Sequence, residues 1–403
     1  MSGGAGTLYL MSSSPSHETP LHQAMSARIE RGEFPGIVTV LARGDDVRVD
    51  AIGVTRFGGD VPMRRDTPFR IASMTKPILA AAAMSLVEDD LIDIEEPVQR
   101  LLPELADRRV LVGYDAELDD TVPARRPITV DDLLTFRLGF GLITDPEWDP
   151  PVPVNERAKE LGLALGPPRP PSPHEPDEWI RRFGTLPLIY QPGERWNYNV
   201  GSLVLGVLLA RAAGRPLGDV LRERIFEPLR MPDTGFWLPP ERAAQLPSHY
   251  LTDSETKQLT EHPDTLPVKW GSPPAFPSGA GGLVSTADDF LTFARMLMDR
   301  GVHGGTRVLS ERSVDAMTTN HLTPAQIAGG GELLAGVGFG FQMGVTVEPD
   351  EFSPPGRYGW SGGYGTDWFN DPHTGLTAIA LTQVSDFLSN GGLTDFVKTA
   401  YAS

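Results

Sequence analysis

Residues 67–105 read TPFRIASMTKPILAAAAMSLVEDDLIDIEEPVQRLLPEL. From Ile78 this stretch is filled with helix-forming residues for about four turns. Ser73 and Lys76 are one helical turn apart, so they share a face, and a serine hydroxyl needs such a neighbouring base to become a nucleophile. Burial against the apolar helix would lower the pKa of the lysine. The spacing alone leaves two interpretations open: a catalytic pair, or a capping serine with Lys76 on the surface.

The chain contains a second copy of the Ser-x-x-Lys pattern. Ser254 and Lys257 stand in the polar run LTDSETKQLTEHPD, which has no apolar face to bury the lysine. An exposed lysine stays protonated near neutral pH and cannot act as a base. The context therefore favours the first copy.

Around this stretch, strand-like and helix-like segments alternate in a simple order. Residues 36–43 and 47–53 are β-branched runs separated by a Gly-Asp-Asp turn, which predicts a hairpin. A helix is predicted from Val200 to Ala213, ended by Gly214 and Pro216, and a second from Thr286, with Ser285 or Thr286 as its N-cap. The remaining expected elements are strands at 337–347, 366–370 and 376–384 and a helix from about Leu393.

These segments predict an α/β (α+β) fold in which an antiparallel sheet, flanked by helices, is built from both chain ends. Residues 20–72 and 275–403 would form the sheet domain, and residues 73–274 an inserted, mainly helical domain. Residues 1–19 are expected to be a flexible tail. Ten prolines between Asp145 and Trp179 argue against a continuous helix or central strand, so 145–179 is interpreted as an ordered irregular loop, with a disordered insert as the alternative. Trp148 and Trp179 would hold the ends of an ordered loop.

Composition excludes several classes of function. The formal charge is −18, which disfavours nucleic acid and anionic membranes as partners. There is no cysteine, so a nucleophile must be a hydroxyl, a carboxylate or an amine. No run approaches the roughly 20 apolar residues of a membrane span, and no signal-peptide core is evident, which favours a cytoplasmic protein. The histidines lack metal-ligand spacing, so no metal or cofactor is expected. The oligomeric state stays open.

Several motifs together resemble the serine β-lactamase and penicillin-binding superfamily, in particular its class C and family VIII carboxylesterase branch. The resemblance runs from about residue 20 to the C-terminus. The motifs that carry it are the opening stretch, TVDDLLTFRLG (129–139), QPGERWNYNVGSLVLG (191–206), SGAGGLVSTADDF (278–290) and YGWSGGYGTDWFNDP (358–372). The resemblance implies that Ser73 is acylated and that Lys76 is its proton partner.

The resemblance also implies a catalytic tyrosine. Tyr198 occupies the first position of the family's Tyr-x-Asn motif, Val200 replaces the asparagine, and Asn199, one place early, is a candidate substrate contact. A tyrosine close to the Lys76 cation could be ionised enough to take a proton, which makes Tyr198 the shared base or the acid for the leaving group. The alternative is a core tyrosine packed beside Trp196.

A third motif is expected on the strand that borders the site. Trp360, Ser361 and Gly362 stand where relatives carry Lys-Thr-Gly or His-x-Gly, and they are candidate substrate contacts. The backbone N–H groups of Gly363 and Ser73 would then form the oxyanion hole, because glycine allows close approach to the acyl group. The alternative is a plain tight turn between strands.

A competing nucleophile is Ser361, because residues 359–363 also fit the Gly-x-Ser-x-Gly elbow of α/β-hydrolases. An elbow must be followed by a helix, whereas residues 364–373 are rich in Gly, Asp, Asn and Pro, and the only histidine downstream is His373. Residues 336–340, GVGFG, are interpreted as a glycine-rich strand and not as a dinucleotide loop.

The departures from the family pattern predict the substrate. Trp360 replaces a cation and Val200 replaces an amide, so a carboxylate-bearing substrate loses two contacts that a neutral ester does not need. We expect a carboxylesterase-type hydrolase that acts through an acyl-enzyme on small neutral short-chain esters, with weak β-lactamase activity at most. The alternatives are a β-lactamase or D-amino-acid peptidase or amidase of the same fold, or a penicillin-binding protein that keeps its adduct.

Overall fold

The computed structural model describes residues 19–142, 152–166, 172–253, 255–262 and 266–403. Of the segments discussed above, residues 1–18, Trp148 and Ser254 lie outside these ranges. The domain boundaries given above stay a prediction.

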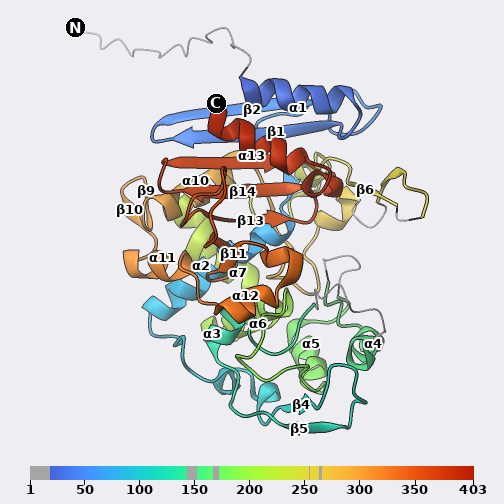
Figure 1. Ribbon diagram of the computed structural model, residues 1–403, viewed down its shortest axis with the longest axis vertical. Helices are drawn as coiled ribbons and strands as arrows, with labels where there is room; N and C mark the ends of the chain where they lie inside the picture. Colours follow the sequence, from blue (N-terminus) through green and yellow to red (C-terminus); the bar gives the residue numbers. More distant parts are fainter. Residues whose placement is uncertain (1–18, 143–151, 167–171, 254, 263–265) are drawn as a thin grey trace, which may run out of the picture.

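One seven-stranded antiparallel sheet joins the two ends of the chain (Figure 1). Its order is β11-β12-β13-β14-β15-β1-β2. The strands are β1 Gly36–Arg43, β2 Asp46–Gly53, β11 Val337–Phe339, β12 Gly344–Thr346, β13 Tyr358–Gly362, β14 Thr366–Asp371 and β15 Leu376–Leu381. β1 pairs with β15 from Val38 opposite Leu381, which is where the N-terminal and C-terminal parts meet. This confirms the predicted α/β fold with an antiparallel sheet flanked by helices.

The hairpin β1–β2 is also confirmed, with Gly36 opposite Gly53 and Arg43 opposite Asp46. The predicted strand 337–347 is two strands instead, because the chain turns between Phe339 and Gly344.

Helices cover both faces of the sheet (Figure 1). α1 Pro20–Glu30 and α13 Gly392–Ala402 lie together on one face, where Phe369 of β14 packs with Phe396. α10 Ala287–Met298 covers the other face; its N-cap is Thr286, whose Oγ1 accepts a hydrogen bond from Asp289 N at 3.3 Å. α1 was not predicted from the sequence.

The middle of the chain is mainly helical and lies on the α10 side of the sheet (Figure 1). α2 Thr75–Glu88 and α6 Val200–Ala213 form its buried centre, and α6 ends at Gly214, which has φ 64°, as predicted. The other helices are α3 Val130–Leu134, α4 Pro153–Glu160, α5 Pro176–Phe183, α7 Leu217–Leu221, α8 Glu227–Leu229, α9 Pro240–Ala243, α11 Glu311–Met317 and α12 Pro324–Ala328. Paired short strands are β3 Phe69–Arg70 with β8 Val284–Ser285, β4 Arg109–Leu111 with β5 Thr121–Pro123, β6 Tyr250–Thr252 with β7 Leu259–Glu261, and β9 Val302–His303 with β10 Thr306–Arg307.

Among the described residues, no single helix is long and apolar enough to cross a membrane, although α6 and the segment Leu217–Leu229, bent by 79°, pass that test as a pair.

The interpretation of 145–179 as an irregular loop holds for residues 161–166 and 172–175 but is wrong for the helices α4 and α5. Proline is tolerated in the first turn of a helix, where its missing N–H has no intrahelical partner. Pro153 and Pro176 begin α4 and α5 in this way. Trp179 is buried inside α5, and its Nε1 donates a hydrogen bond to the carbonyl oxygen of Leu163 at 2.7 Å. These two prolines therefore begin short helices, and no continuous helix runs through the described part of the segment.

Candidate active site

Ser73 lies in a short 3-10 turn, Ala72–Met74, between β3 and α2. β3 pairs with β8, and Ile71 N donates a hydrogen bond to the carbonyl oxygen of Leu283 at 3.1 Å, which sets the position of the turn. Ala72 has φ 45°, a left-handed backbone that L-residues with a side chain seldom adopt. Such strain is typical of functional turns, and here it lies immediately before the serine.

Lys76 is completely buried, and its Nζ lies 3.0 Å from Ser73 Oγ and 2.5 Å from the carbonyl oxygen of Ala280. Burial lowers the pKa of Lys76 well below its ordinary value. In the part of the chain that the structure describes, no carboxylate pairs with this amine. A carbonyl oxygen can only accept, so one N–H of Lys76 is directed at Ala280.

The segment that supplies Ala280 passes between α2 and α6. A Cβ atom added to Gly279 would lie 2.8 Å from Leu79 and 2.9 Å from the carbonyl oxygen of Ser202, so only glycine permits this approach. The amide of Leu283 donates a hydrogen bond to Thr75 Oγ1 at 3.2 Å. The segment 278–282 is thereby held against the start of α2. Its role as the lysine's partner was not predicted, although its sequence was among the family-like motifs.

The second Ser-x-x-Lys pattern has a different environment. Lys257 is exposed, in a turn with φ 58°, and its amide donates to the carbonyl oxygen of Asp253. Only Lys76 of the two has the burial that favours a neutral amine.

Tyr198 completes a group of three polar side chains. Its hydroxyl is hydrogen bonded to the Ser73 side chain and accepts from Trp360 Nε1 at 2.9 Å, and its ring lies 4.6 Å from Lys76 Nζ. Burial raises the pKa of Tyr198 to about 12, although the hydrogen bonds with Ser73 and Trp360 act in the opposite direction. Burial thus disfavours the phenolate that the role of base would need, and the roles of shared base and of leaving-group acid stay predictions.

An aromatic cluster holds the tyrosine ring. Its centroid is 5.6 Å from that of Trp196, 5.5 Å from that of Phe136 and 5.7 Å from that of Trp360. Tyr198 is thus packed beside Trp196, as the alternative interpretation required, while its hydroxyl faces Ser73. Packing of the ring and placement of the hydroxyl are compatible.

Asn199 lines the cavity at Ser73, but its side-chain amide already has partners. Its backbone has φ 84°, and its Nδ2 donates to the carbonyl oxygens of Leu165 at 2.6 Å and Gly166 at 3.4 Å. The amide therefore holds the end of the 163–166 segment against the start of α6. Its role as a substrate contact stays a prediction.

Ser361 lies inside β13, opposite Asp367 of β14, and its Oγ donates to Asp367 Oδ1 at 2.6 Å. Burial raises the pKa of Asp367. A strand, and not a helix, follows Ser361, and His373 is exposed in the turn after β14. The nucleophile elbow is therefore absent from this position.

Gly362 brings the end of β13 close to the serine turn, whereas no close contact requires glycine at position 363. A Cβ on Gly362 would lie 2.3 Å from the carbonyl oxygen of Ile71, so the strand can approach only as glycine. Gly363 is exposed, and a Cβ there would meet nothing within 4 Å. The turn is also tight, since Gly365 N donates to the carbonyl oxygen of Gly362 at 2.9 Å. The tight turn is thus present, and the oxyanion hole formed by Gly363 and Ser73 stays a prediction.

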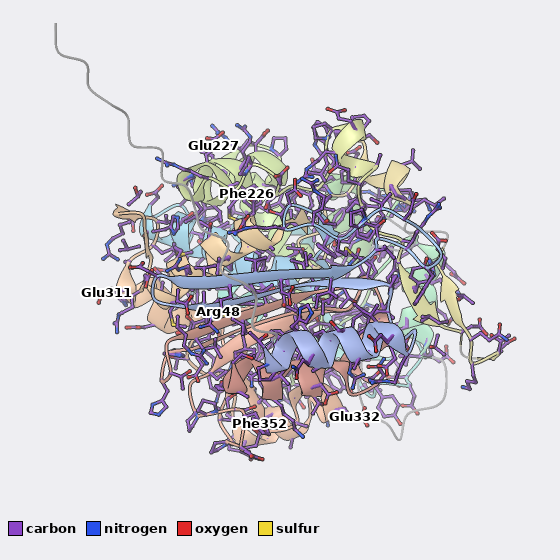
Figure 2. All side chains as sticks on the ribbon, turned by 90° about the horizontal axis from the view of Figure 1, so that it is seen from above. Arg48, Phe226, Glu227, Glu311, Glu332 and Phe352 are labelled. Carbon is purple, nitrogen blue, oxygen red and sulfur yellow. The ribbon has the colours of Figure 1, made fainter. Side chains whose placement is uncertain are left out.

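A cavity of about 560 Å³ opens onto these residues, within the usual range for ligand sites. It is lined by Ser73, Leu142, Tyr198, Ala280, Glu332, Leu333, Arg357, Trp360, Ser361, Gly363, Asp367, Phe369, Leu388 and Leu393, among others. A larger cavity of about 1260 Å³ is lined in part by Phe226 and Glu227, and Figure 2 shows these two residues on the opposite side of the molecule from Glu332. The described lining of that larger cavity contains no serine, lysine or histidine.

Arg357 is a cation in this cavity that the sequence motifs did not indicate. Its guanidinium lies 3.8 Å from the centroid of the Phe369 ring and donates to the Phe352 carbonyl oxygen at 2.6 Å and to Ser353 Oγ at 3.0 Å. It stands immediately before β13, and its charge acts to lower the pKa of Asp367, against the larger effect of burial. Arg357 therefore brings positive charge to the same cavity as Ser73.

Comparisons with known proteins agree with this geometry. The family model described as Beta-lactamase matches residues 21–397. Protein Rv1367c of Mycobacterium tuberculosis is 37% identical over 366 residues, covering 88% of this chain and 87% of that protein. Esterase EstB of Burkholderia gladioli is 31% identical over 384 residues, covering 91% and 90%. The solved structure of EstCE1, a hydrolase with promiscuous acyltransferase activity, has a TM-score of 0.76 at 25% identity, covering 95% of this chain and 97% of that one. The chain belongs to the Beta-lactamase family, within the superfamily of serine β-lactamases and penicillin-binding proteins.

Proposed function

We propose that this protein is a serine carboxylesterase that cleaves neutral short-chain esters through an acyl-enzyme on Ser73. The observation that carries the proposal is the position of Lys76: a buried amine with no carboxylate partner among the described residues, 3.0 Å from Ser73 Oγ. A neutral amine at that distance can take the serine proton without first losing its own.

Acylation begins when the Lys76 amine accepts the proton of Ser73 and Oγ bonds to the ester carbonyl carbon. The carbonyl electrons move to its oxygen, where the N–H groups of Ser73 and Gly363 stabilise the negative charge. When the ester C–O bond breaks, the Tyr198 hydroxyl gives its proton to the leaving alkoxide and regains one from the Lys76 ammonium. The proton of the serine thus ends on the alcohol, and the lysine is neutral again.

Deacylation repeats these steps with water in place of serine. Water loses a proton to the neutral Lys76 amine, its oxygen bonds to the acyl carbon, and the Ser73–acyl bond breaks. The serine oxygen recovers a proton from the lysine by way of Tyr198, which leaves the carboxylic acid and free enzyme. A tyrosine with a raised pKa suits this role, because it remains a proton donor at neutral pH.

The charges around the cavity support a neutral substrate. Trp360 offers an apolar wall, and its Nε1 is already bonded to Tyr198. The Arg357 guanidinium lines the same cavity but is already engaged by the Phe369 ring, the Phe352 carbonyl oxygen and Ser353 Oγ. A carboxylate next to the scissile bond would find neither a cation at position 360 nor the amide that Val200 replaces, and each missing contact is worth about 1–3 kcal/mol in a partly desolvated site.

The test is a comparison of kcat/KM for butyryl esters and β-lactams on the same preparation. We expect the butyryl ester of a good leaving group to exceed any penicillin or cephalosporin by at least about a hundredfold, the ratio that two lost contacts imply. Opening of a cephalosporin as fast as cleavage of the butyryl ester would overturn the proposal.

A further inference from the structure

A chain of hydrogen bonds leads away from the cavity behind Gly363. The carbonyl oxygen of Gly363 accepts a hydrogen bond from Ser385 Oγ at 2.7 Å. Ser385 Oγ in turn lies 2.9 Å from Nε2 of His249. The single hydroxyl proton of Ser385 is committed to the carbonyl, so Nε2 of His249 carries the proton that the serine oxygen accepts. The direction of the chain is thus set as His249 to Ser385 to Gly363.

His249 is held firmly enough to act as the fixed end of this chain. It is 1% exposed, and its ring centroid lies 4.7 Å from that of Tyr364, the residue that follows Gly363. The residues that follow His249 are hydrogen bonded to residues before and after Ser385. Tyr250 N donates to the Gln383 carbonyl oxygen at 2.8 Å, and Thr252 N donates to Asp386 Oδ2 at 2.8 Å.

Gly363 itself is weakly held by packing. It has no side chain, it is exposed to the cavity, and a Cβ would meet nothing within 4 Å. Its neighbours are anchored: Thr366 Oγ1 donates to the Ile71 carbonyl oxygen at 3.2 Å, and Gly365 is fitted closely against the Val384 carbonyl oxygen. The hydrogen bond from Ser385 therefore limits rotation at the most loosely packed residue of the turn.

We infer that Ser385 and His249 are positioning residues that orient the Gly363 backbone for oxyanion binding. This inference rests on the proposed function, because it requires that the Gly363 N–H faces the acyl oxygen. A displacement of a catalytic group by about 1 Å can lower a rate a hundredfold, and loss of a whole oxyanion donor lowers it by about a hundredfold to a thousandfold. The two residues act on the tetrahedral state and not on binding of the substrate's remote parts.

The experiment uses four variants of the full-length protein: Ser385→Ala, Ser385→Thr, His249→Phe and His249→Gln. Each is assayed with a butyryl ester, with an alkyl boronic acid that forms a tetrahedral adduct, and with an unreactive ether analogue of the ester. Ser389→Ala is the matched control, because that serine is exposed in the same segment and its Oγ bonds to the Asp386 carbonyl oxygen, away from Gly363.

We expect Ser385→Ala and His249→Phe to lower kcat/KM at least about tenfold and to weaken boronic acid inhibition by a similar factor, while affinity for the ether stays within about twofold. Ser385→Thr and His249→Gln keep a donor in place and should stay within about threefold of the parent protein. Ser389→Ala should match the parent.

Two results would overturn the inference. One is an unchanged rate, with Ser385→Ala and His249→Phe as active as the parent. The other is a loss of activity without any loss of boronic acid affinity, which would show general damage. If Ser385→Ala does not fold, the inference is tested by comparing His249→Phe with His249→Gln in the same assays. Failure of the proposed function is distinct: the parent protein itself would neither cleave the ester nor bind the boronic acid through Ser73.

Discussion

Replacement of Lys76 by methionine should remove activity and change how stability depends on pH. Methionine has nearly the same volume as lysine and fits the same buried space without a titratable group. We expect kcat/KM for a butyryl ester to fall at least about a thousandfold, as when a member of a catalytic group is lost. The pH dependence of the free energy of unfolding, measured by urea titration from about pH 6 to about pH 9, should also differ between the variant and the parent protein.

The sign of this change follows from the burial of Lys76. Its pKa is lowered in the folded protein, whereas an unfolded lysine has a pKa of about 10.4. The folded state therefore binds fewer protons, and the parent protein gains stability as pH rises toward that value. Where the amine is neutral when folded and charged when unfolded, the gain is about 1.4 kcal/mol per pH unit. Loss of the donor to the Ala280 carbonyl oxygen costs the variant about 1–3 kcal/mol at every pH.

The stability of Lys76→Met relative to the parent protein should thus be highest at low pH and should decrease as pH rises, because only the parent gains stability with pH. Lys257→Met is the control, because that lysine is exposed, and its difference should be flat. A flat difference for Lys76→Met as well would mean that Lys76 is charged in the folded protein over this range. It could not then act as the base, and the reasoning would be refuted.

Three further predictions use the same assays. Ser73→Ala should lower kcat/KM at least about a thousandfold, whereas Ser361→Ala should keep acylation; loss of labelling only in Ser361→Ala would favour the elbow. Lys76→Ala and Tyr198→Phe should each be nearly as damaging as both together, and additive losses would show independent action. In Trp360→Phe the Tyr198 hydroxyl loses its hydrogen-bond donor, so kcat should fall about tenfold with KM little changed. An unchanged kcat would show that this hydrogen bond does not assist Tyr198 in proton transfer.

Sequence patterns predicted those parts of the fold that depend on local chemistry. The β1–β2 hairpin and α6 have the bounds that their turn residues and end signals indicate, because glycine and proline act on the backbone nearby. α1 and the helices α4 and α5 were missed or misread, since their stability comes from packing: Trp179 is buried against residues distant in sequence. Proline occurs both after the end of a helix and in the first turn of a helix, and only tertiary contacts distinguish the two cases.

In the candidate site, too, the residues linked by local spacing could be predicted from the sequence, and the others could not. Ser73 and Lys76 are linked by helical spacing, so their proximity follows from the sequence. The Ala280 carbonyl oxygen and Arg357 come from segments that only the fold brings to the cavity; the motif 278–290 marks the first segment, but not its contact with Lys76. The ionisation state of Tyr198 depends on its burial, which a linear pattern does not contain.

The most direct test of the central claim is mass spectrometry of the protein quenched within its first turnovers of a butyryl ester, and separately after mixing with a penicillin. We predict one butyryl group on the peptide that contains Ser73, which disappears as the ester is consumed, and no adduct in Ser73→Ala. A persistent penicillin adduct with no ester turnover would identify a non-turnover penicillin-binding protein. An adduct on any other residue, or none in a fully active preparation, would contradict the acyl-enzyme at Ser73.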